Sequence, residues 1–468
     1  MSKISGLKGN KIFFTGIGGS SMSGLALLLK KEGYEVSGSD MQDSVKLQHL
    51  KDAGIPVAIG HSAENVRGFD ALVYTAAVRG DNPELAYARQ NGLQLIKRSQ
   101  LVGMIMKMYR QAVAISGTKG KTTTTALVTT ILLECGLEPS ALIGGTAKNI
   151  GSNVRVGESR VIVAEACEYE DSFLDFCPTV GVILNVEMEH TDYFKSMEQL
   201  KGSFRGFAAR LPEDGVLIGC GDCPVTREII RGDSHPHLLF GIDTPSDLMA
   251  ENIVQTADGF LCFDLILRGE KAIQLKTPII GRHNAYNVLA AVAAALQFDL
   301  SLEEIARALL CYKGAGRRFD YYGSINGAAV YDDYAHTPDE YRAVIESADY
   351  LPHGRLICIF QPHTYSRSID FFEETVAAFA RCDEVIMIDI YAAREKDEGK
   401  IHSRDFARAM QEKGIAACYM ESFDRVCDYV EQTAKEGDIV LVIGAGTSNK
   451  LCEMIAARGV PTQQMHGD

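Results

Sequence analysis

The sequence predicts an α/β protein of three domains, and three observations support this prediction. The chain has 468 residues, 46 % of them hydrophobic, which at roughly 150 residues per domain is enough for about three separate cores. Strand-like and helix-like segments alternate almost throughout, as in parallel sheets covered by helices. Finally, apolar runs break into a glycine-rich or polar turn before a helix at residues 11–24, 112–125 and 330–340.

These three turns place one α/β unit in each third of the chain. We expect joints near residues 109–112 and near residues 313–318, where the letters GAGRR interrupt the pattern. The predicted domains are a Rossmann-like N-terminal domain (1–110), a central P-loop ATPase-like domain (111–315) and a Rossmann-like C-terminal domain (316–468). An antiparallel excursion around residues 259–273 would make the central sheet mixed.

Composition excludes several classes of protein. Acidic residues outnumber basic ones by 61 to 47, which disfavours a nucleic-acid binder that relies on a basic surface. The N-terminal letters do not form a signal peptide, and the longest small apolar stretch, 288–296, is far below the roughly 20 residues of a spanning helix. Twelve scattered cysteines are typical of reduced thiols in a cytoplasmic protein. The close pair Cys220 and Cys223 is half a zinc site or a turn after a strand.

The clearest motif is a glycine-rich loop between a strand and a helix. In ISGTKGKTTTT, an expected strand over 112–116 leads into the loop, and a helix then reaches about residue 135. Backbone N–H groups and the helix N-terminus would bind phosphate, Lys121 would add charge, and Thr122 would offer an oxygen to Mg²⁺. Ile115 stands where the complete Walker pattern has glycine, and a structural turn is the other reading. The predicted phosphate-binding residues are Gly117, Thr118, Lys119, Gly120, Lys121, Thr122 and Thr123.

Two further side chains of the central domain are candidate metal ligands. Glu165 closes an apolar strand over 160–164, and His190 follows a strand over 180–184. Because parallel strands end at one edge of a sheet, both would face the phosphate loop. A carboxylate that closes an apolar strand is costly to bury without a partner, whereas His190 alone also fits a loop histidine satisfied by local carboxylates.

The N-terminal loop FFTGIGGSSMSG partly matches the dinucleotide fingerprint. Gly16 and Gly18 are correctly placed, but Ser21 stands at the third glycine position. Asp40 follows the second strand, over 34–38, where a ribose-binding carboxylate would stand. The loop therefore indicates a nucleotide more than NAD in particular, and a structural turn stays open.

Six motifs in order resemble the Mur ligases over essentially the whole chain. They are GIGGSSMSGLA, GTKGKTTTT, GRHNAYNVLAA, DDYAHTP, FQPHTYSRS and IYAAREKDEGKIHS. The resemblance implies ATP-dependent amide synthesis through an acyl phosphate, in peptidoglycan biosynthesis. The N-terminal domain would bind a UDP-sugar, the central domain ATP and Mg²⁺, and the C-terminal domain the incoming amino acid. Within the family, the chain is most similar to the branch that adds L-alanine to UDP-N-acetylmuramate.

Carried over to matching positions, the resemblance also implies roles for individual residues. The candidate catalytic side chains are Lys121, Glu165, His190, His336, His363 and Arg367. Mg²⁺ would bind Thr122 and Glu165, with His190 helping a second metal. The adenine, ribose and phosphates of ATP would also meet His283, Asn284, Asn287, Arg317 and Asp333. The UDP-sugar would meet Gly18, Gly19, Ser20, Asp40 and His61.

Three positions depart from the alanine-adding branch and leave the amino acid open. Lys119 and Thr337 stand where histidine is usual, and Thr447 stands near a usual aspartate. A ligase for another amino acid or for a recycled peptide is therefore an alternative. An NAD-dependent oxidoreductase and a non-catalytic binding protein are more distant ones. The sequence does not indicate the oligomeric state, the degree of domain closure, or whether a lysine such as Lys201 is carbamylated.

Overall fold

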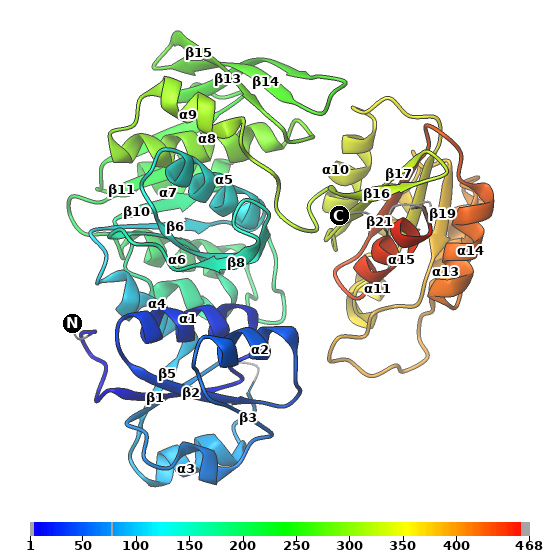
Figure 1. Cartoon of the computed structure of the whole chain (residues 1–468). Helices are drawn as coiled ribbons and strands as arrows, with labels where there is room; N and C mark the ends of the chain where they lie inside the picture. The colour runs from blue at the N-terminus through cyan, green and yellow to red at the C-terminus, as the bar shows by residue number, and fades with distance from the viewer. Residues whose placement is uncertain (1–3, 76–77, 460–468) are drawn as a thin grey trace, which may run out of the picture. The chain divides into compact units, whose positions relative to one another are not determined.

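The computed structural model describes residues 4–75 and 78–459, which form three sheets with helices packed on them (Figure 1). Two compact units are present. One contains most of the chain up to residue 313, and the other contains residues from 314 onward together with segments 253–262 and 277–284. The break at residue 313 lies where the letters GAGRR indicate a joint.

The N-terminal sheet is Rossmann-like, with five parallel strands in the order β3-β2-β1-β4-β5. β1 is buried along most of its length because KIFFT is nearly all apolar after its first residue. The strands are β1 (Lys11–Thr15), β2 (Glu35–Asp40), β3 (Val57–Ile59), β4 (Ala71–Tyr74) and β5 (Gln94–Lys97). The helices are α1 (Ser20–Lys31), α2 (Val45–Asp52), η1 (Ala63–Val66), α3 (Pro83–Gln90) and α4 (Arg98–Met106).

The central sheet has ten strands in the order β15-β14-β13-β12-β11-β10-β6-β9-β7-β8. Its strands are β6 (Gln111–Ser116), β7 (Ser140–Ala147), β8 (Ser152–Arg155), β9 (Val161–Glu165), β10 (Val180–Ile183), β11 (Val216–Cys220), β12 (His237–Gly241), β13 (Leu248–Gln255), β14 (Leu261–Leu267) and β15 (Glu270–Thr277). Its helices are α5 (Lys121–Glu134), η2 (Tyr169–Asp175), α6 (Met197–Ala208), α7 (Pro224–Arg231), α8 (Asn284–Ala295), η3 (Leu296–Phe298) and α9 (Leu302–Leu309).

The central sheet is mixed, as predicted. β8 runs antiparallel to β7, and β14 is joined to its neighbour β15 by Arg268 and Gly269, both with positive φ, which is hairpin geometry. This hairpin extends to Thr277, four residues beyond the predicted excursion. Cys220 and Cys223 flank a turn after β11, where Asp222 accepts N–H bonds from residues 242–244. The turn reading of this cysteine pair fits that arrangement.

The C-terminal sheet has six strands in the order β16-β17-β21-β18-β19-β20. Only β16 is antiparallel to its neighbour among these described pairs, so the rest of the sheet is Rossmann-like. The strands are β16 (Asp320–Ile325), β17 (Ala328–Asp333), β18 (Leu356–Phe360), β19 (Glu384–Met387), β20 (Ala417–Tyr419) and β21 (Ile439–Ile443). The helices are α10 (Pro338–Ala348), α11 (Tyr365–Asp370), α12 (Phe372–Ala378), α13 (Ser403–Glu412), α14 (Phe423–Thr433) and α15 (Asn449–Gly459).

The N-terminal and central sheets share one hydrophobic core. Helices α1 and α4 lie between these two sheets, with α1 against β7 and β8 and α4 against η2 (Figure 1). The buried cluster joins Met22 and Leu101 from these helices to Phe173 and Phe176 of the central domain. Ser99 Oγ donates a 2.6 Å hydrogen bond to Asp175 across the same contact. The sheets therefore belong to one packed body.

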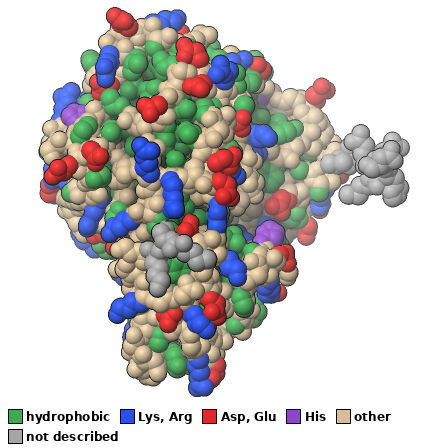
Figure 2. Space-filling model, turned by 60° about the vertical axis from the view of Figure 1, so that its left-hand side comes forward, with side chains coloured by type: hydrophobic (Ala, Val, Ile, Leu, Met, Phe, Trp, Pro, Cys, Tyr) green, Lys and Arg blue, Asp and Glu red, His purple; other side chains and the backbone are tan. Residues whose placement is uncertain are grey.

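Three properties of the described chain bear on function. On the face seen in Figure 2, basic and acidic side chains are interspersed, without a continuous basic surface. None of the helices described is both long and apolar enough to cross a membrane. The twelve cysteines are all free thiols, and the Sγ atoms of Cys358 and Cys382 lie 3.2 Å apart.

Candidate active site

The phosphate loop follows β6, which lies between β9 and β10 in the central sheet. Ile115 pairs with Glu165 and Ser116 pairs with Ile183, so the three strands end together at the loop. The loop passes so close to β10 that a Cβ atom on Gly117 would lie 2.9 Å from Leu184 Cβ. Gly120 has φ of 86° and precedes α5, whose N-terminus therefore opens onto the loop.

Lys121 is folded back over this loop. Its Nζ donates to the carbonyls of Gly117 and Thr118, and to Glu168, whose carboxylate oxygens lie 3.0 and 3.2 Å away. Burial, the largest single influence, would lower the pKa of Lys121, but Glu168, Cys167 and Glu165 together outweigh it and raise the pKa. Lys121 is therefore a fixed positive charge at the point where a phosphate would arrive.

A hydroxyl and a carboxylate form a candidate Mg²⁺ site beside the loop. Thr122 Oγ1 donates a 2.8 Å hydrogen bond to Glu165 Oε2, which also accepts the N–H of Gly144 at 2.7 Å. A Cβ atom on Gly144 would come within 2.3 Å of Glu165 Oε1, so glycine keeps this side of the carboxylate open. Hydroxyl and carboxylate oxygens are hard donors of the kind that Mg²⁺ prefers, so these two residues fit the ion.

No group of three or more His, Cys, Asp or Glu side chains that could hold a metal occurs within residues 4–75 and 78–459. Mg²⁺ in phosphoryl-transfer enzymes commonly uses one or two protein groups and completes its shell with waters and substrate phosphates. The Thr122 and Glu165 pair is compatible with that mode of binding.

His190 lies on the other side of Glu168. Its Nε2 is 3.7 Å from Glu168 Oε1, and its ring packs on Tyr169 with the centroids 4.7 Å apart. Burial lowers the pKa of His190, opposed by the Glu168 charge. His190 also has a positive φ of 52°, a conformation that L residues adopt at a cost and that is common at functional sites.

A second ion pair ties the phosphate loop to the segment after β10. Lys119 Nζ lies 2.5 Å from Glu187 Oε2, and the Lys119 N–H donates to the Asn185 side chain at 2.8 Å. The Thr118 hydroxyl completes the attachment, because it accepts the Glu187 N–H and donates to the Glu187 carbonyl. Lys119 thus has a partner in the structure and is more than a solvated surface lysine.

The start of α8 supplies two of the predicted adenine-site residues. Thr124 Oγ1 donates a 3.2 Å hydrogen bond to Asn287 Oδ1, which brings α8 against the loop helix α5. Asn284 Nδ2 donates to the Ile280 carbonyl at 2.7 Å and lies 3.1 Å from His283 Nε2. Asn284 and Asn287 are buried, His283 is exposed, and Thr123 is buried within α5.

The predicted UDP-sugar residues gather at the carboxyl ends of β1, β2 and β3. Asp40 Oδ2 accepts the Gly18 N–H at 2.9 Å, so the acidic residue braces the glycine loop. Gly19 immediately precedes α1, and the helix begins with the backbone of Ser20. His61 Nδ1 lies 3.0 Å from Ser39 Oγ and 3.1 Å from Glu84, a fully buried carboxylate.

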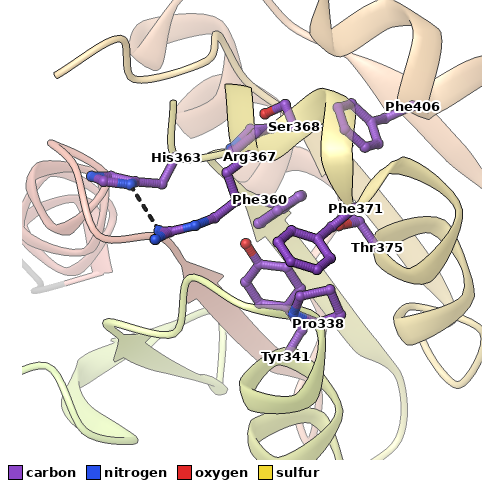
Figure 3. A pocket seen from close by; sticks show the side chains of 10 residues that line it. Pro338, Tyr341, Phe360, His363, Arg367, Ser368, Phe371, Thr375 and Phe406 are labelled. Carbon is purple, nitrogen blue, oxygen red and sulfur yellow. Dashed lines mark hydrogen bonds between the residues drawn. The ribbon is translucent and has the colours of Figure 1, made fainter. Parts of the chain in front are cut away.

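The C-terminal unit brings His336, His363 and Arg367 together. The two imidazole centroids are 6.0 Å apart, and Arg367 Nη1 lies 3.2 Å from His363 Nδ1 (Figure 3). Because arginine can only donate, His363 Nδ1 must accept and the imidazole is neutral. Burial and the charges of His336 and Arg367 lower the pKa of His363 to about 4, which agrees with that assignment.

A pocket extends from this pair into the domain. Figure 3 shows His363 and Arg367 beside it, while the other side chains around it are mainly aromatic or small and uncharged. They include Tyr341, Phe360, Phe371 and Phe406, with Ser368 and Thr375. The pair thus supplies the charged and basic groups beside an otherwise uncharged cavity.

Arg317 and Asp333 have structural partners in the C-terminal unit. Arg317 Nε donates a 2.9 Å hydrogen bond to Asp332, and its Nη atoms donate to the carbonyls of Gly444 and Gly446 and to Ser448. The carboxylate oxygens of Asp333 accept the N–H groups of Phe319 and Ala335 at 2.7 and 2.8 Å. Arg317 therefore ties the end of β17 to the turn after β21, and Asp333 braces the turn that follows β17.

Sequence reasoning missed three side chains that hold these clusters together. They are Glu168 between Lys121 and His190, Asn185 beneath the phosphate loop, and Glu84 behind His61. Glu168 lies in the acidic run EYED, whose members look alike in sequence. For Glu84, the letters NPE do indicate a helix start, but they do not indicate a buried carboxylate.

Comparisons with known proteins agree with this geometry. Three family models match in order: "Mur ligase family, catalytic domain" at residues 11–110, "Mur ligase middle domain" at 115–295, and "Mur ligase, glutamate ligase domain" at 317–446. Two relatives named UDP-N-acetylmuramate–L-alanine ligase come from Caldanaerobacter subterraneus and Clostridium acetobutylicum. They are 43 % and 40 % identical, over 94 % and 96 % of this chain and 95 % and 98 % of their own.

Solved structures give the same result. The crystal structure of UDP-N-acetylmuramate-alanine ligase from Thermotoga maritima has a TM-score of 0.82 at 26 % identity, and the match covers 96 % of this chain and 98 % of the other. A murein peptide ligase from Psychrobacter arcticus has a TM-score of 0.68 at 22 % identity, over 97 % of this chain and all of the other, which shows a shared fold.

Proposed function

The chain belongs to the Mur ligase family, and from this premise we propose that it is a UDP-N-acetylmuramate–L-alanine ligase of peptidoglycan biosynthesis. The reaction joins the lactyl carboxylate of UDP-N-acetylmuramate to the amine of L-alanine and converts ATP to ADP and phosphate. The observation that carries the proposal is the phosphate loop with Lys121 over it and the Thr122 and Glu165 pair beside it. We expect the reaction to take place in the cytoplasm, where ATP and the UDP-sugar would be available.

The chemistry divides into two steps. A carboxylate is a poor electrophile, so a carboxylate oxygen first attacks the γ-phosphorus of ATP, and the bond to the β-γ bridging oxygen breaks to release ADP. The alanine amine then attacks the acyl carbon of the resulting acyl phosphate, loses a proton, and expels phosphate. Catalysis of phosphoryl transfer depends chiefly on positioning and charge stabilisation.

The central residues would supply that stabilisation. Lys121 and the N–H groups of the loop would bind the β- and γ-phosphates, because their positive charge is already held in place. Mg²⁺ bound at Thr122 and Glu165 would neutralise phosphate charge. His190 would help a second metal near the acceptor carboxylate. The loop residues 117–123 with His283, Asn284 and Asn287 would hold the rest of the nucleotide.

The outer domains would hold the two other substrates. We assign the UDP-sugar to residues 1–110, with Gly18, Gly19, Ser20, Asp40 and His61 around it. ATP belongs to residues 111–315, and the amino acid belongs to residues 316–468. There Arg367 would bind a carboxylate or phosphate oxygen, while the neutral His363, together with His336, would orient it. Arg317 and Asp333 would meet the nucleotide from this domain.

The test is an amino acid panel with product mass. Phosphate release is expected only when ATP, UDP-N-acetylmuramate and an amino acid are all present, and the largest turnover is expected with L-alanine. A main product with another amino acid or a peptide would identify the alternative ligase that Lys119, Thr337 and Thr447 suggested. No turnover with any amino acid would contradict the proposal.

A variant of Lys121 tests whether ATP and the UDP-sugar bind at separate sites. Lys121→Ala should abolish acyl phosphate formation and leave UDP-sugar binding nearly unchanged, because the proposed UDP-sugar residues lie on another sheet. Loss of acyl phosphate formation together with loss of UDP-sugar binding would contradict the assignment of substrates to domains.

A further inference from the structure

A buried carboxylate with no assigned role joins two residues of the proposed ATP site. Only 1 % of the Glu168 side chain is exposed. Its Oε2 lies 3.0 Å from Lys121 Nζ, and its Oε1 lies 3.2 Å from the same nitrogen and 3.7 Å from His190 Nε2. Lys121 is the first residue of α5, and His190 lies in the segment after β10. The Glu168 carboxylate therefore lies between two separate elements at the same edge of the sheet.

The backbone after Glu168 is held in a costly conformation. Glu170 and Asp171 both have positive φ, at 52° and 55°, although neither is glycine. Residues in this conformation are strained and persist only where surrounding contacts hold them. Here Asp171 accepts hydrogen bonds from Tyr193, at 2.6 Å, and from Ser203. This sharp turn begins two residues after Glu168, whose carboxylate is directed inward.

Glu168 restrains an otherwise mobile amine. An ammonium group has three donors, and those of Lys121 are directed to Gly117, Thr118 and Glu168. The first two acceptors belong to the phosphate loop, so Glu168 is the partner that anchors the amine to another element. A free lysine side chain loses rotamer entropy when it is fixed. Because folding has already fixed the amine, the phosphoryl-transfer step does not bear that cost.

We propose that Glu168 is a positioning residue, whose carboxylate holds the Lys121 amine in a fixed arrangement beside the phosphate loop. The proposal rests on the proposed function, because it takes this loop as the ATP site. Glu168 also neutralises part of the Lys121 charge, so its removal should leave ground-state attraction for ATP intact. The loss should fall on the chemical step, in which the orientation of the Lys121 amine matters.

Steady-state kinetics of Glu168→Gln test this division. The glutamine keeps the size of the side chain and removes its charge. We expect kcat to fall by at least about tenfold while KM for ATP stays equal or decreases. Glu170→Gln is the matched control, because Glu170 is exposed on the same strained turn. It should keep both constants close to those of the parent. A raised KM with unchanged kcat in Glu168→Gln would overturn the proposal.

A second measurement does not depend on the substrate. Acetylation of the full-length chain by an amine-directed reagent, followed by peptide mass spectrometry, reports the accessibility of Lys121. Labelling of Lys121 should increase several-fold in Glu168→Gln and not in Glu170→Gln. Unchanged labelling would overturn the proposal even if the enzyme proved to use a different amino acid. Lack of turnover in the parent chain, with the labelling difference present, would instead count against the proposed function.

A conservative variant covers the case in which Glu168→Gln fails to fold. Glu168→Asp keeps the charge and withdraws the carboxylate by one methylene. Increased Lys121 labelling and a lowered kcat, at an unchanged melting temperature, would support the positioning role. Parent-like labelling and kcat in this variant would overturn it, because the exact reach of the carboxylate would then not matter.

Discussion

The side-chain oxygen of Asn287 lies 2.3 Å from the position that a Cβ atom on Gly120 would occupy. Gly120 has a φ of 86° and immediately precedes α5, and Asn287 also accepts a hydrogen bond from Thr124 on that helix. The start of α8 and the phosphate loop therefore fit together only because position 120 has no side chain. Both residues belong to the proposed ATP site, so this contact couples its phosphate and adenine ends.

We expect Gly120→Ala to raise KM for ATP by at least about tenfold, which corresponds to roughly 1.4 kcal/mol. The added methyl group must displace Asn287, besides straining a residue with positive φ. Gly136→Ala is the control, because Gly136 also has positive φ, follows α5, and has no atom within 4 Å of an added Cβ. Equal KM values in the two variants would show that the contact with Asn287 has no importance for ATP.

The Lys119 and Glu187 ion pair should act as a brace of the loop. Because both side chains are partly exposed, their interaction should contribute about 0.2–1 kcal/mol. Lys119→Ala, Glu187→Ala and the double variant should then raise KM for ATP by similar small factors, below about fivefold, and the two single effects should not add. If Lys119 bound phosphate directly, Lys119→Ala would raise KM strongly and Glu187→Ala would not.

His363 should remain neutral throughout the physiological range. Burial, together with the charges of His336 and Arg367, lowers its pKa to about 4. In NMR spectra of the histidine-labelled chain, the resonance lost in His363→Gln should not shift between about pH 5.5 and pH 8. A titration of that resonance with a midpoint near 6.5 would contradict the burial and the Arg367 contact described above.

Asp332 should make the C-terminal unit less stable as the pH rises through weakly acidic values. Burial raises the pKa of Asp332 from 3.8 to about 6, although Arg317 opposes the change. The folded state therefore binds more protons between these values, and roughly 3 kcal/mol of stability is lost on passing from pH 4 to above pH 6. In Asp332→Asn the side chain at position 332 cannot titrate. The melting temperature of this variant should therefore rise relative to that of the parent as the pH increases. A constant difference between the two would contradict the prediction.

Local patterns predicted much of the fold and the phosphate site. The loop after β6 was predictable because glycine, lysine and threonine act within one turn, between an apolar strand and a helix. Glu165 was predictable because it closes a buried strand, and the register of Ile115 with Glu165 explains why it reaches the loop. Element ends were less predictable: the second strand spans Glu35–Asp40, whereas apolar letters indicated 34–38.

Residues that act through long-range contacts could not be predicted in the same way. Glu168 differs from its acidic neighbours only because a turn with two positive φ values directs it inward, and no single-residue preference encodes that turn. Asn185 supports a loop 66 positions earlier in the chain, and Glu84 reaches the loop residue His61 from the start of α3. Their partners become apparent only when the strands are placed side by side.

The core shared by the first two sheets limits how the enzyme can be divided or deformed. A Cβ atom on Gly103 would lie 1.9 Å from the Asp175 carbonyl, which shows how closely α4 approaches η2. A fragment ending at residue 110 would expose Leu101, Val102 and Ile105 to water and should aggregate. The glycine loop after β1 and the phosphate loop after β6 therefore belong to one packed body, and a change in their separation would have to disrupt this core.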